Sequence, residues 1–131
     1  MIFVDTNVIM FAVGREHPLR ASAQSFFESS IDHGLCTSAE VLQELMHAYL
    51  PVQRMATLDA AFRLVERAIP RVLPIEADDV RSARLIADRH PELGSRDLLH
   101  LAVCRRHGVR QIKTFDRALG AAARKSDRRA R

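Results

Sequence analysis

The sequence IFVDTN (residues 2–7) runs three apolar residues into a carboxylate, Asp5, and a second apolar run follows at residues 8–11. Residues 2–4 are typical of a short buried strand. Asp5 therefore stands at the carboxyl end of a strand. In that place an acid is either a turn-forming residue or a functional group.

Strand-like and helix-like segments alternate beyond this opening. The residue patterns predict strands at 2–4, 35–37, 71–75 and 109–115, and helices at 18–33, 39–50, 53–69, 77–90, 96–107 and, in short form, after residue 116. Ser38 and Ser95 are predicted N-caps, and Pro74 places its strand near a sheet edge. Strands separated by helices imply parallel pairing, so we predict an α/β fold, a three-layer sandwich around a small parallel sheet of four or five strands.

Length and composition suit a single globular domain. The 131 residues are 47% hydrophobic and 27% charged, without a membrane-spanning run or a good signal peptide. Cys36 and Cys104 are too few and too far apart for a disulfide framework, which favours reduced, buried thiols in a cytoplasmic protein. Residues 105–131 hold ten Lys or Arg against two acids. This end indicates a polyanion partner, or else a solvated tail.

Four acids stand in unusual places: Asp5, Glu44, Asp97 and Asp116. Taken singly, Asp5 and Asp116 fit turn acids after strands, Glu44 fits a salt bridge beside the core, and Asp97 fits the start of a helix. If the first and last strands are neighbours, however, all four acids meet at one sheet edge. Such carboxylates would repel each other and raise their pKa values, and a hard divalent cation such as Mg²⁺ or Mn²⁺ relieves that repulsion.

The segments that hold these acids resemble the PIN-domain family and, within it, the VapC-like toxins of bacterial toxin–antitoxin pairs. The matching segments are VDTN (4–7), TSAEVLQEL (37–45), SRDLLHLAV (95–103) and TFD (114–116). The resemblance implies a PIN-like nuclease domain at 1–124 and a basic tail at 125–131. Many relatives have another short strand after the last acid, whereas this chain has the sequence ALGAAARKSDRRAR (118–131) there. We therefore expect the sheet to lack this edge strand.

The resemblance also implies an activity, a cofactor and partners. It predicts an endoribonuclease that uses Mg²⁺ or Mn²⁺, with Asp5 and Asp97 as the primary metal ligands and Glu44 and Asp116 completing the shell. Thr6, Asn7 and Thr114 match positions that support the ligands or the attacking water. A cognate antitoxin, which would bind a groove between the first helices, and a homodimer are expected. The arginines predicted to hold the RNA backbone are Arg105, Arg106, Arg110, Arg117 and Arg124. With aromatic residues at 5%, RNA shape is expected to outweigh base stacking in recognition.

Other interpretations remain open at this level. The chain could be a catalytically idle PIN-like module that binds RNA or a protein, or a phospho-acceptor domain that uses Asp5. His47 and His100 each follow a proposed ligand by three residues, which imitates the Glu-x-x-His unit of di-iron bundles. We rank both as structural or supporting residues, and Glu40 as a partner of the helix dipole. The helix at 53–69 is either core or interface.

Overall fold

The computed structural model describes the backbone of residues 1–130 and the side chains of residues 1–125. The strands are β1 (Ile2–Val4), β2 (Leu35–Ser38), β3 (Arg71–Leu73) and β4 (Gln111–Lys113). The helices are α1 (Thr6–Val13), α2 (Pro18–Ser30), the 3-10 turn η1 (Ile31–His33), α3 (Ala39–Tyr49), α4 (Met55–Ala68), α5 (Ala77–Ala87), α6 (Ser95–Arg106) and α7 (Arg117–Ala130). Strands and helices alternate along the chain as predicted, with one additional helix, α1.

The sheet has four parallel strands in the order β3-β2-β1-β4. Phe3 of β1 lies opposite Cys36 of β2 on one side and Ile112 of β4 on the other. The first and last strands are therefore neighbours, as the prediction for the acids requires. β3, which precedes Pro74, is an edge strand as expected, and the described part of the chain forms no fifth strand.

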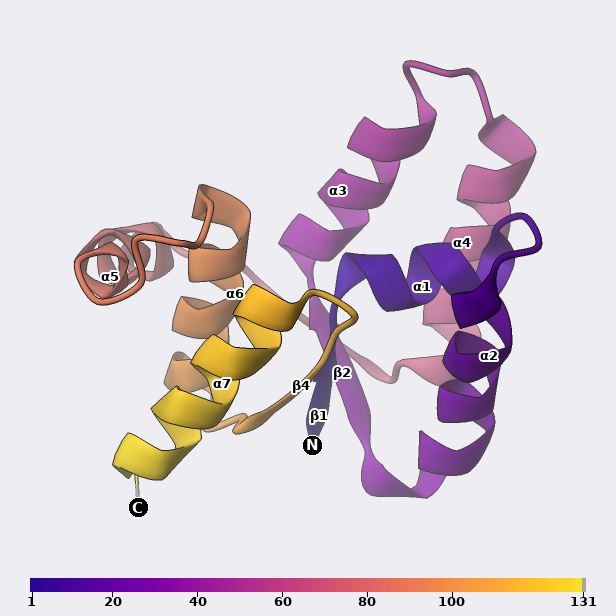
Figure 1. Ribbon diagram of the computed structural model, residues 1–131. Helices are drawn as coiled ribbons and strands as arrows, with labels where there is room; N and C mark the ends of the chain where they lie inside the picture. The colour runs from indigo at the N-terminus through magenta and orange to yellow at the C-terminus, as the bar shows by residue number, and fades with distance from the viewer. Residues whose placement is uncertain (131) are drawn as a thin grey trace.

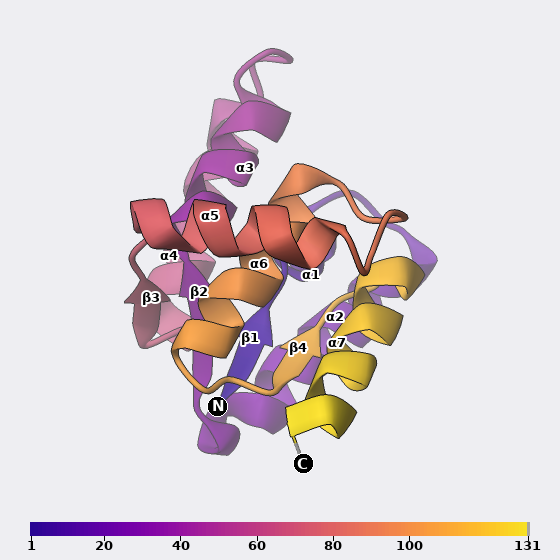
Figure 2. The same ribbon diagram turned by 90° about the vertical axis from the view of Figure 1, so that its left-hand side faces the viewer.

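Helices cover both faces of the sheet, which confirms the three-layer α/β/α architecture (Figures 1 and 2). On one face α1 packs against α2 and α4, and α3 packs against α4. On the other face α5 packs against α6, and α7 lies beside β4. Phe3, Val4 and Leu45 belong to the larger hydrophobic cluster, and Leu101 and Leu119 belong to the smaller one between α5, α6 and α7.

Three differences from the predicted elements concern how helices begin and end. Helix α1 was not predicted, and it begins at Thr6 because the Asp5 side chain accepts a hydrogen bond from the Thr6 backbone N–H. Ser38 caps α3 as predicted, whereas Gly94 is the N-cap of α6, and Ser95 is its first helical residue. The final helix is not short.

Helix α7 extends from Arg117 to Ala130 and carries the chain through the predicted boundary at residues 124 and 125 without a break. The side chains of residues 126–131, which make up most of the predicted basic tail, are not among those that the structure describes. The division into a nuclease domain and a tail therefore stays a prediction. Cys36 and Cys104 are both free and buried, as expected. Within the described residues, no helix combines the length and apolar character needed to cross a bilayer.

Arg106 ties the end of α6 to the start of α5. Its Nε lies 2.7 Å from Asp79 Oδ1, its Nη2 lies 3.0 Å from Asp79 Oδ2, and the same Nη2 donates to the Pro74 carbonyl at 3.0 Å. The Asp79 carboxylate is buried and also accepts from the Glu76 backbone N–H at 2.8 Å. This arginine was predicted to hold RNA, but the structure gives it a structural role between two helices.

Candidate metal centre

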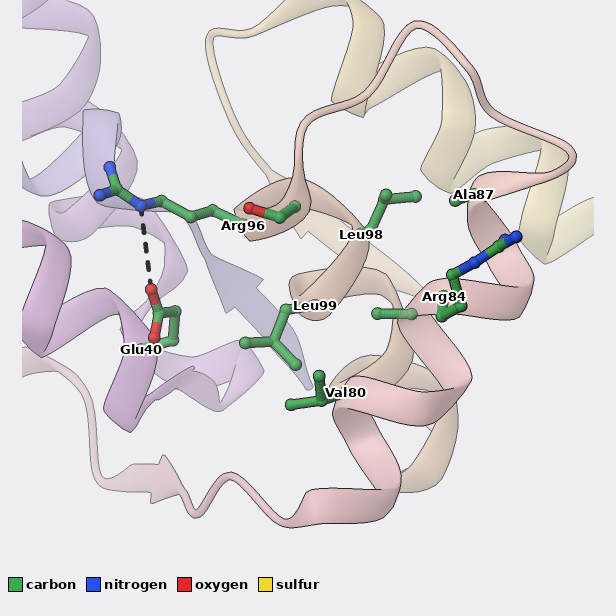
Figure 3. Close-up of a pocket in the computed structure, with 9 residues that line it drawn as sticks. Glu40, Val80, Arg84, Ala87, Arg96, Leu98 and Leu99 are labelled. Carbon is green, nitrogen blue, oxygen red and sulfur yellow. Dashed lines mark ion pairs between the residues drawn. The ribbon is translucent and has the colours of Figure 1, made fainter.

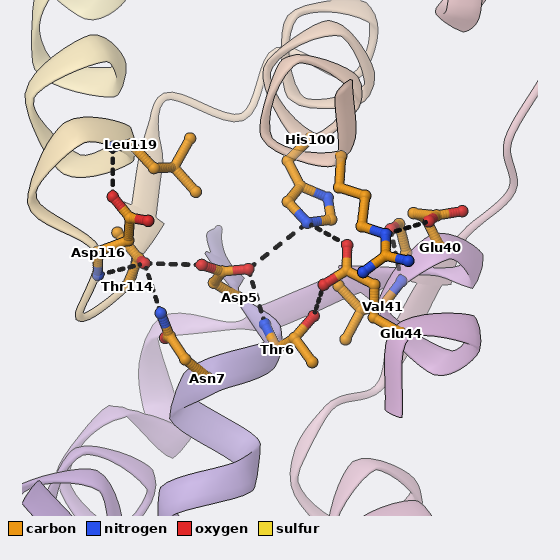
Figure 4. A network of polar contacts seen from close by, with 12 residues as sticks. Asp5, Thr6, Asn7, Glu40, Val41, Glu44, His100, Thr114, Asp116 and Leu119 are labelled. Atoms are coloured by element: carbon orange, nitrogen blue, oxygen red, sulfur yellow. Dashed lines mark hydrogen bonds and ion pairs between the residues drawn. The ribbon is translucent and has the colours of Figure 1, made fainter. Parts of the chain in front are cut away.

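Asp5 lies at the centre of a polar network at the carboxyl edge of the sheet (Figure 4). β1 ends one residue earlier, so the side chain projects above the strand ends, where it is only 5% exposed. One carboxylate oxygen accepts from the Thr6 backbone N–H at 2.8 Å, and the other accepts from the Thr114 hydroxyl at 2.7 Å. Asp5 is therefore both the turn-forming residue and a candidate functional group.

Glu44 reaches the same place from α3. Its Oε2 accepts a short hydrogen bond from the Thr6 hydroxyl, and its Oε1 lies 3.0 Å from Nε2 of His100. The latter contact is an ion pair without hydrogen-bond alignment, so Oε1 is a buried oxygen with no hydrogen-bond donor among the described residues. A buried acceptor of this kind is open to another electropositive partner.

His100 is 1% exposed and projects from α6 between the two carboxylates. Its Nε2 lies 3.5 Å from Asp5 Oδ1 as well as 3.0 Å from Glu44 Oε1. Donor atoms of these three residues all fall within 4.8 Å of one another, the spacing of a metal site. Sequence reasoning had ranked His100 as structural or supporting. The one signal for its position was its place one helical turn after Asp97.

Asp97 and Asp116 stand at the borders of this cluster. Asp97 is half-buried in the first turn of α6, and the negative charges of Asp5, Asp116 and Glu44 all act on it. Asp116 is exposed, and its Oδ1 accepts from the Leu119 backbone N–H at 3.1 Å, which caps α7. The structure brings all four predicted acids to one edge of the sheet. The closest group of donors, however, is Asp5, Glu44 and His100, and it includes neither Asp97 nor Asp116.

Burial is the main influence on the pKa values of the acids, and the charges of their neighbours modify it. Burial raises the pKa of Asp97 to about 6, and the neighbouring Asp5 charge adds to the rise. Burial also raises the pKa of Asp5, in spite of the nearby His100. For Glu44, burial alone would raise the pKa, but the contacts with His100 and Thr6 hold it below its usual range. His100 has a raised pKa despite its burial, because both carboxylates favour the imidazolium.

Comparison with known proteins shows the family of the chain. The sequence model of the PIN domain matches residues 2–125. The chain belongs to the PIN-domain family. Among curated relatives of this PIN domain is "Ribonuclease VapC23" of Mycobacterium tuberculosis H37Rv, which is 59% identical over 126 residues, covering 95% of this chain and 99% of that protein. "Ribonuclease VapC13" of the same strain is 41% identical over 119 residues, covering 89% and 91%.

Solved structures share the fold of this PIN domain. Mycobacterium tuberculosis VapC20, described as a sarcin–ricin loop cleaving toxin, superposes with a TM-score of 0.78 at 26% identity, covering 93% of this chain and 95% of that one. FitAcB from Neisseria gonorrhoeae gives a TM-score of 0.70 at 24% identity, covering 94% and 93%, which supports the fold alone. These similarities confirm the predicted family and fold.

Polar residues next to the acids form a second network in the PIN domain. The Thr114 hydroxyl, which donates to Asp5, accepts from the Asn7 amide at 3.2 Å and from the Asp116 backbone N–H at 3.0 Å. The Asn7 carbonyl oxygen accepts from the Phe115 backbone N–H at 3.2 Å. Thr6, Asn7 and Thr114, the three residues predicted to support the ligands, all lie in contact with the acids or with one another.

The predicted RNA-binding arginines divide between the two ends of the sheet. Arg105 lies in the last turn of α6, and Arg110 precedes β4 and lines a pocket with Met1 and Ile2. β4 runs from that end toward Thr114, so both arginines lie at the edge opposite Asp5. Arg117 and Arg124 belong to α7, which begins at the acid-bearing edge.

Sequence reasoning also missed a basic residue next to the acids. Arg96, at the start of α6, lies 4.0 Å from Glu40 of α3, and its charge contributes to the lowered pKa of Glu44. Glu40, predicted to act on the helix dipole, thus also has an ion-pair partner.

His47 is exposed, so the di-iron interpretation lacks its first histidine.

An apolar pocket of about 330 Å³ lies beside this ion pair, between α3, α5 and α6 (Figure 3). Val80, Leu98 and Leu99 form much of its wall, and Glu40 and Arg96 stand at one end. The residues that line it include none of the four predicted acids. This pocket is therefore distinct from the candidate metal centre.

Proposed function

We propose that this PIN domain is a Mg²⁺- or Mn²⁺-dependent endoribonuclease and the toxin of a toxin–antitoxin pair. The observation that carries the proposal is the convergence of Asp5, Glu44, Asp97 and Asp116 at the carboxyl edge of the sheet, where Asp97 has a pKa of about 6. The names of the curated relatives, all ribonucleases of the VapC type, support the same activity.

The residues present fit a hard divalent cation. The buried Oε1 of Glu44 lacks a hydrogen-bond donor among the described residues, and four carboxylates outnumber the single imidazolium of His100. Asp5, Asp97, Glu44 and Asp116 would hold the cation through oxygen atoms, which Mg²⁺ and Mn²⁺ prefer. When bound, the cation supplies a water of lowered pKa and neutralises charge on the phosphate.

The protein's own groups position this chemistry. The Thr6 and Thr114 hydroxyls each donate to one acid, Glu44 and Asp5 respectively, and so fix the direction in which the carboxylate oxygens point. His100 offsets part of the negative charge when the protein is free of metal. We assign the phosphate contacts to Arg117 and Arg124, because both lie on α7, which begins directly after Asp116. Arg105 and Arg110 lie at the opposite edge of the sheet, and Arg106 is paired with Asp79.

A divalent cation should stabilise the folded protein. Binding to the native state alone adds about 2–3 kcal/mol when the cation is at roughly a hundred times its dissociation constant. We expect the melting temperature to rise with MgCl₂ or MnCl₂ at constant ionic strength. The rise should be much smaller in Glu44→Gln, and it should be unchanged in Glu66→Gln, which alters an exposed acid of α4. An identical response in all three proteins would exclude a metal at this edge.

The ends of the cleaved RNA test the proposed hydrolysis. Because we assign the attack to water, cleavage should leave a 5′-phosphate and a 3′-hydroxyl, and a 2′-deoxy substitution at the cut site should leave the reaction intact. End-labelling and ligation of the fragments measure both. A 2′,3′-cyclic phosphate product would contradict water as the nucleophile.

Partners follow from the same proposal. A cognate antitoxin, bound by the groove between the first helices, and a homodimer are expected of a VapC-type toxin, and RNA is the substrate. The competing possibility is an idle module that binds RNA or a protein without cutting it. Incubation of total RNA with the protein, with and without Mg²⁺, separates the two, since only an enzyme yields metal-dependent fragments.

A further inference from the structure

Arg124 lies back along α7 toward the acid-bearing edge. If residue 120 carried a Cβ, that atom would lie 3.4 Å from Nη1 of Arg124 and 3.7 Å from Cγ2 of Thr114. The guanidinium and the Thr114 side chain are thus neighbours of the same bare glycine. The hydroxyl of Thr114 in turn donates to Asp5 at 2.7 Å.

No acid within the described residues forms an ion pair with Arg124, and its side chain is exposed. Other arginines of the chain differ in this respect: Arg84 pairs with Asp88 at 2.9 Å, and Arg106 pairs with Asp79 at 2.7 Å. An exposed guanidinium without an acidic partner among the described side chains, close to a carboxylate cluster, suits a phosphate group that is shared with a cation.

We propose that Arg124, whose guanidinium lies over Gly120, binds the phosphate of the RNA strand next to the cut bond. This inference rests on the proposed function and adds a specific contact and the glycine that leaves room for it. A side chain longer than a methyl group at position 120 would occupy the place of the guanidinium. Gly120 is therefore part of the RNA-binding surface although it has no polar side chain.

RNA binding without metal tests the contact separately from cleavage. A fluorescein-labelled single-stranded RNA of mixed sequence is titrated in EDTA at several salt concentrations with wild type, Arg124→Ala, Arg124→Lys and Arg67→Ala. Arg67 is an exposed arginine in the last turn of α4, so its variant loses the same charge far from the acids. For Arg124→Ala we expect roughly ten-fold weaker binding and a salt slope smaller by about 0.7, the value for one lost phosphate contact.

Arg124→Lys should recover part of the affinity, and Arg67→Ala should stay within about two-fold of wild type. Gly120→Leu should behave like Arg124→Ala, and the double variant Gly120→Leu/Arg124→Ala should bind no more weakly than either single variant. That non-additivity is expected only if the residue at position 120 acts through Arg124.

Two results would overturn the inference while the proposed function stands. In the first, wild type cuts RNA and Arg124→Ala binds like Arg67→Ala. In the second, Arg124→Ala loses affinity together with thermal stability while its salt slope is unchanged, which indicates a structural role. If wild type neither binds nor cuts RNA, the proposed function fails and takes this inference with it.

Discussion

Replacing Asp5 by Asn should reduce RNA cleavage by about a hundred-fold or more, the typical cost of removing one preorganised charged group from an active site. Asp5 is the most central acid of the cluster, in contact with Thr6, Thr114 and His100. Asn keeps the shape and one acceptor oxygen but removes the charge that a cation needs. The measurement is single-turnover cleavage of RNA in Mg²⁺.

The same variant should stay folded. Burial raises the pKa of Asp5, so its ionised form is less stable in the native state than in the unfolded chain at neutral pH. Removing the charge therefore should leave the melting temperature equal to or above that of the metal-free wild type. Asp59→Asn, an exposed position on α4, is the matched control and should retain full cleavage. Normal cleavage by Asp5→Asn would refute the assignment of the site.

Asp79→Ala should produce the largest loss of stability, about 2–3 kcal/mol, because it leaves Arg106 without its main partner and removes an acceptor from the α5 capping box. This loss of stability is smaller than the loss expected for a fully buried ion pair, because the Arg106 side chain is 30% exposed. Urea unfolding followed by circular dichroism measures it. Asp78→Ala is the control, because its ion pair with Arg81 is exposed on both sides.

Asp79 also gives stability a defined pH dependence. The hydrogen bond from Arg106 lowers the pKa of Asp79 in the folded protein. A carboxyl group whose pKa is lower in the folded protein contributes its full stabilisation to the folded state above its unfolded pKa of about 3.9. This stabilisation is lost as the pH falls through the lower pKa of the folded state. The difference in unfolding free energy between wild type and Asp79→Asn should therefore shrink on acidification below about pH 4. A difference that stays constant down to pH 2 would contradict the assignment of the pair.

Much of the fold could be predicted because its signals are local. Glycines at 34 and 108 and the proline at 51 mark where elements end, and the strands between predicted helices leave few alternatives to a parallel sheet. Helix α1 escaped prediction for a physical reason. It lies between the sheet, α2 and α4 with every residue at least half-buried, so it lacks the polar face that reveals a helix in a sequence.

The part of the site that could be predicted is the part whose position follows from where the strands end and the helices begin. Asp5 and Asp116 follow strands, and Glu44 and Asp97 lie on helices that begin at the same edge, so their approach follows from topology. His100 could not be placed, because its position between two carboxylates depends on how α6 docks on the sheet. Arg106 resembled other basic residues near the C-terminus, and only the tertiary packing pairs it with an acid 27 positions earlier.

The strand order has a consequence for synthesis of the protein. β1 is the first strand to leave the ribosome, yet it occupies an inner position and waits for β4 to complete the sheet. The hydrogen bond from Thr114 to Asp5 spans 109 positions of the chain. A nascent polypeptide therefore cannot bring Asp5, Glu44, Asp97 and Asp116 together until residue 116 has emerged, so the proposed site forms only after most of the chain has been made.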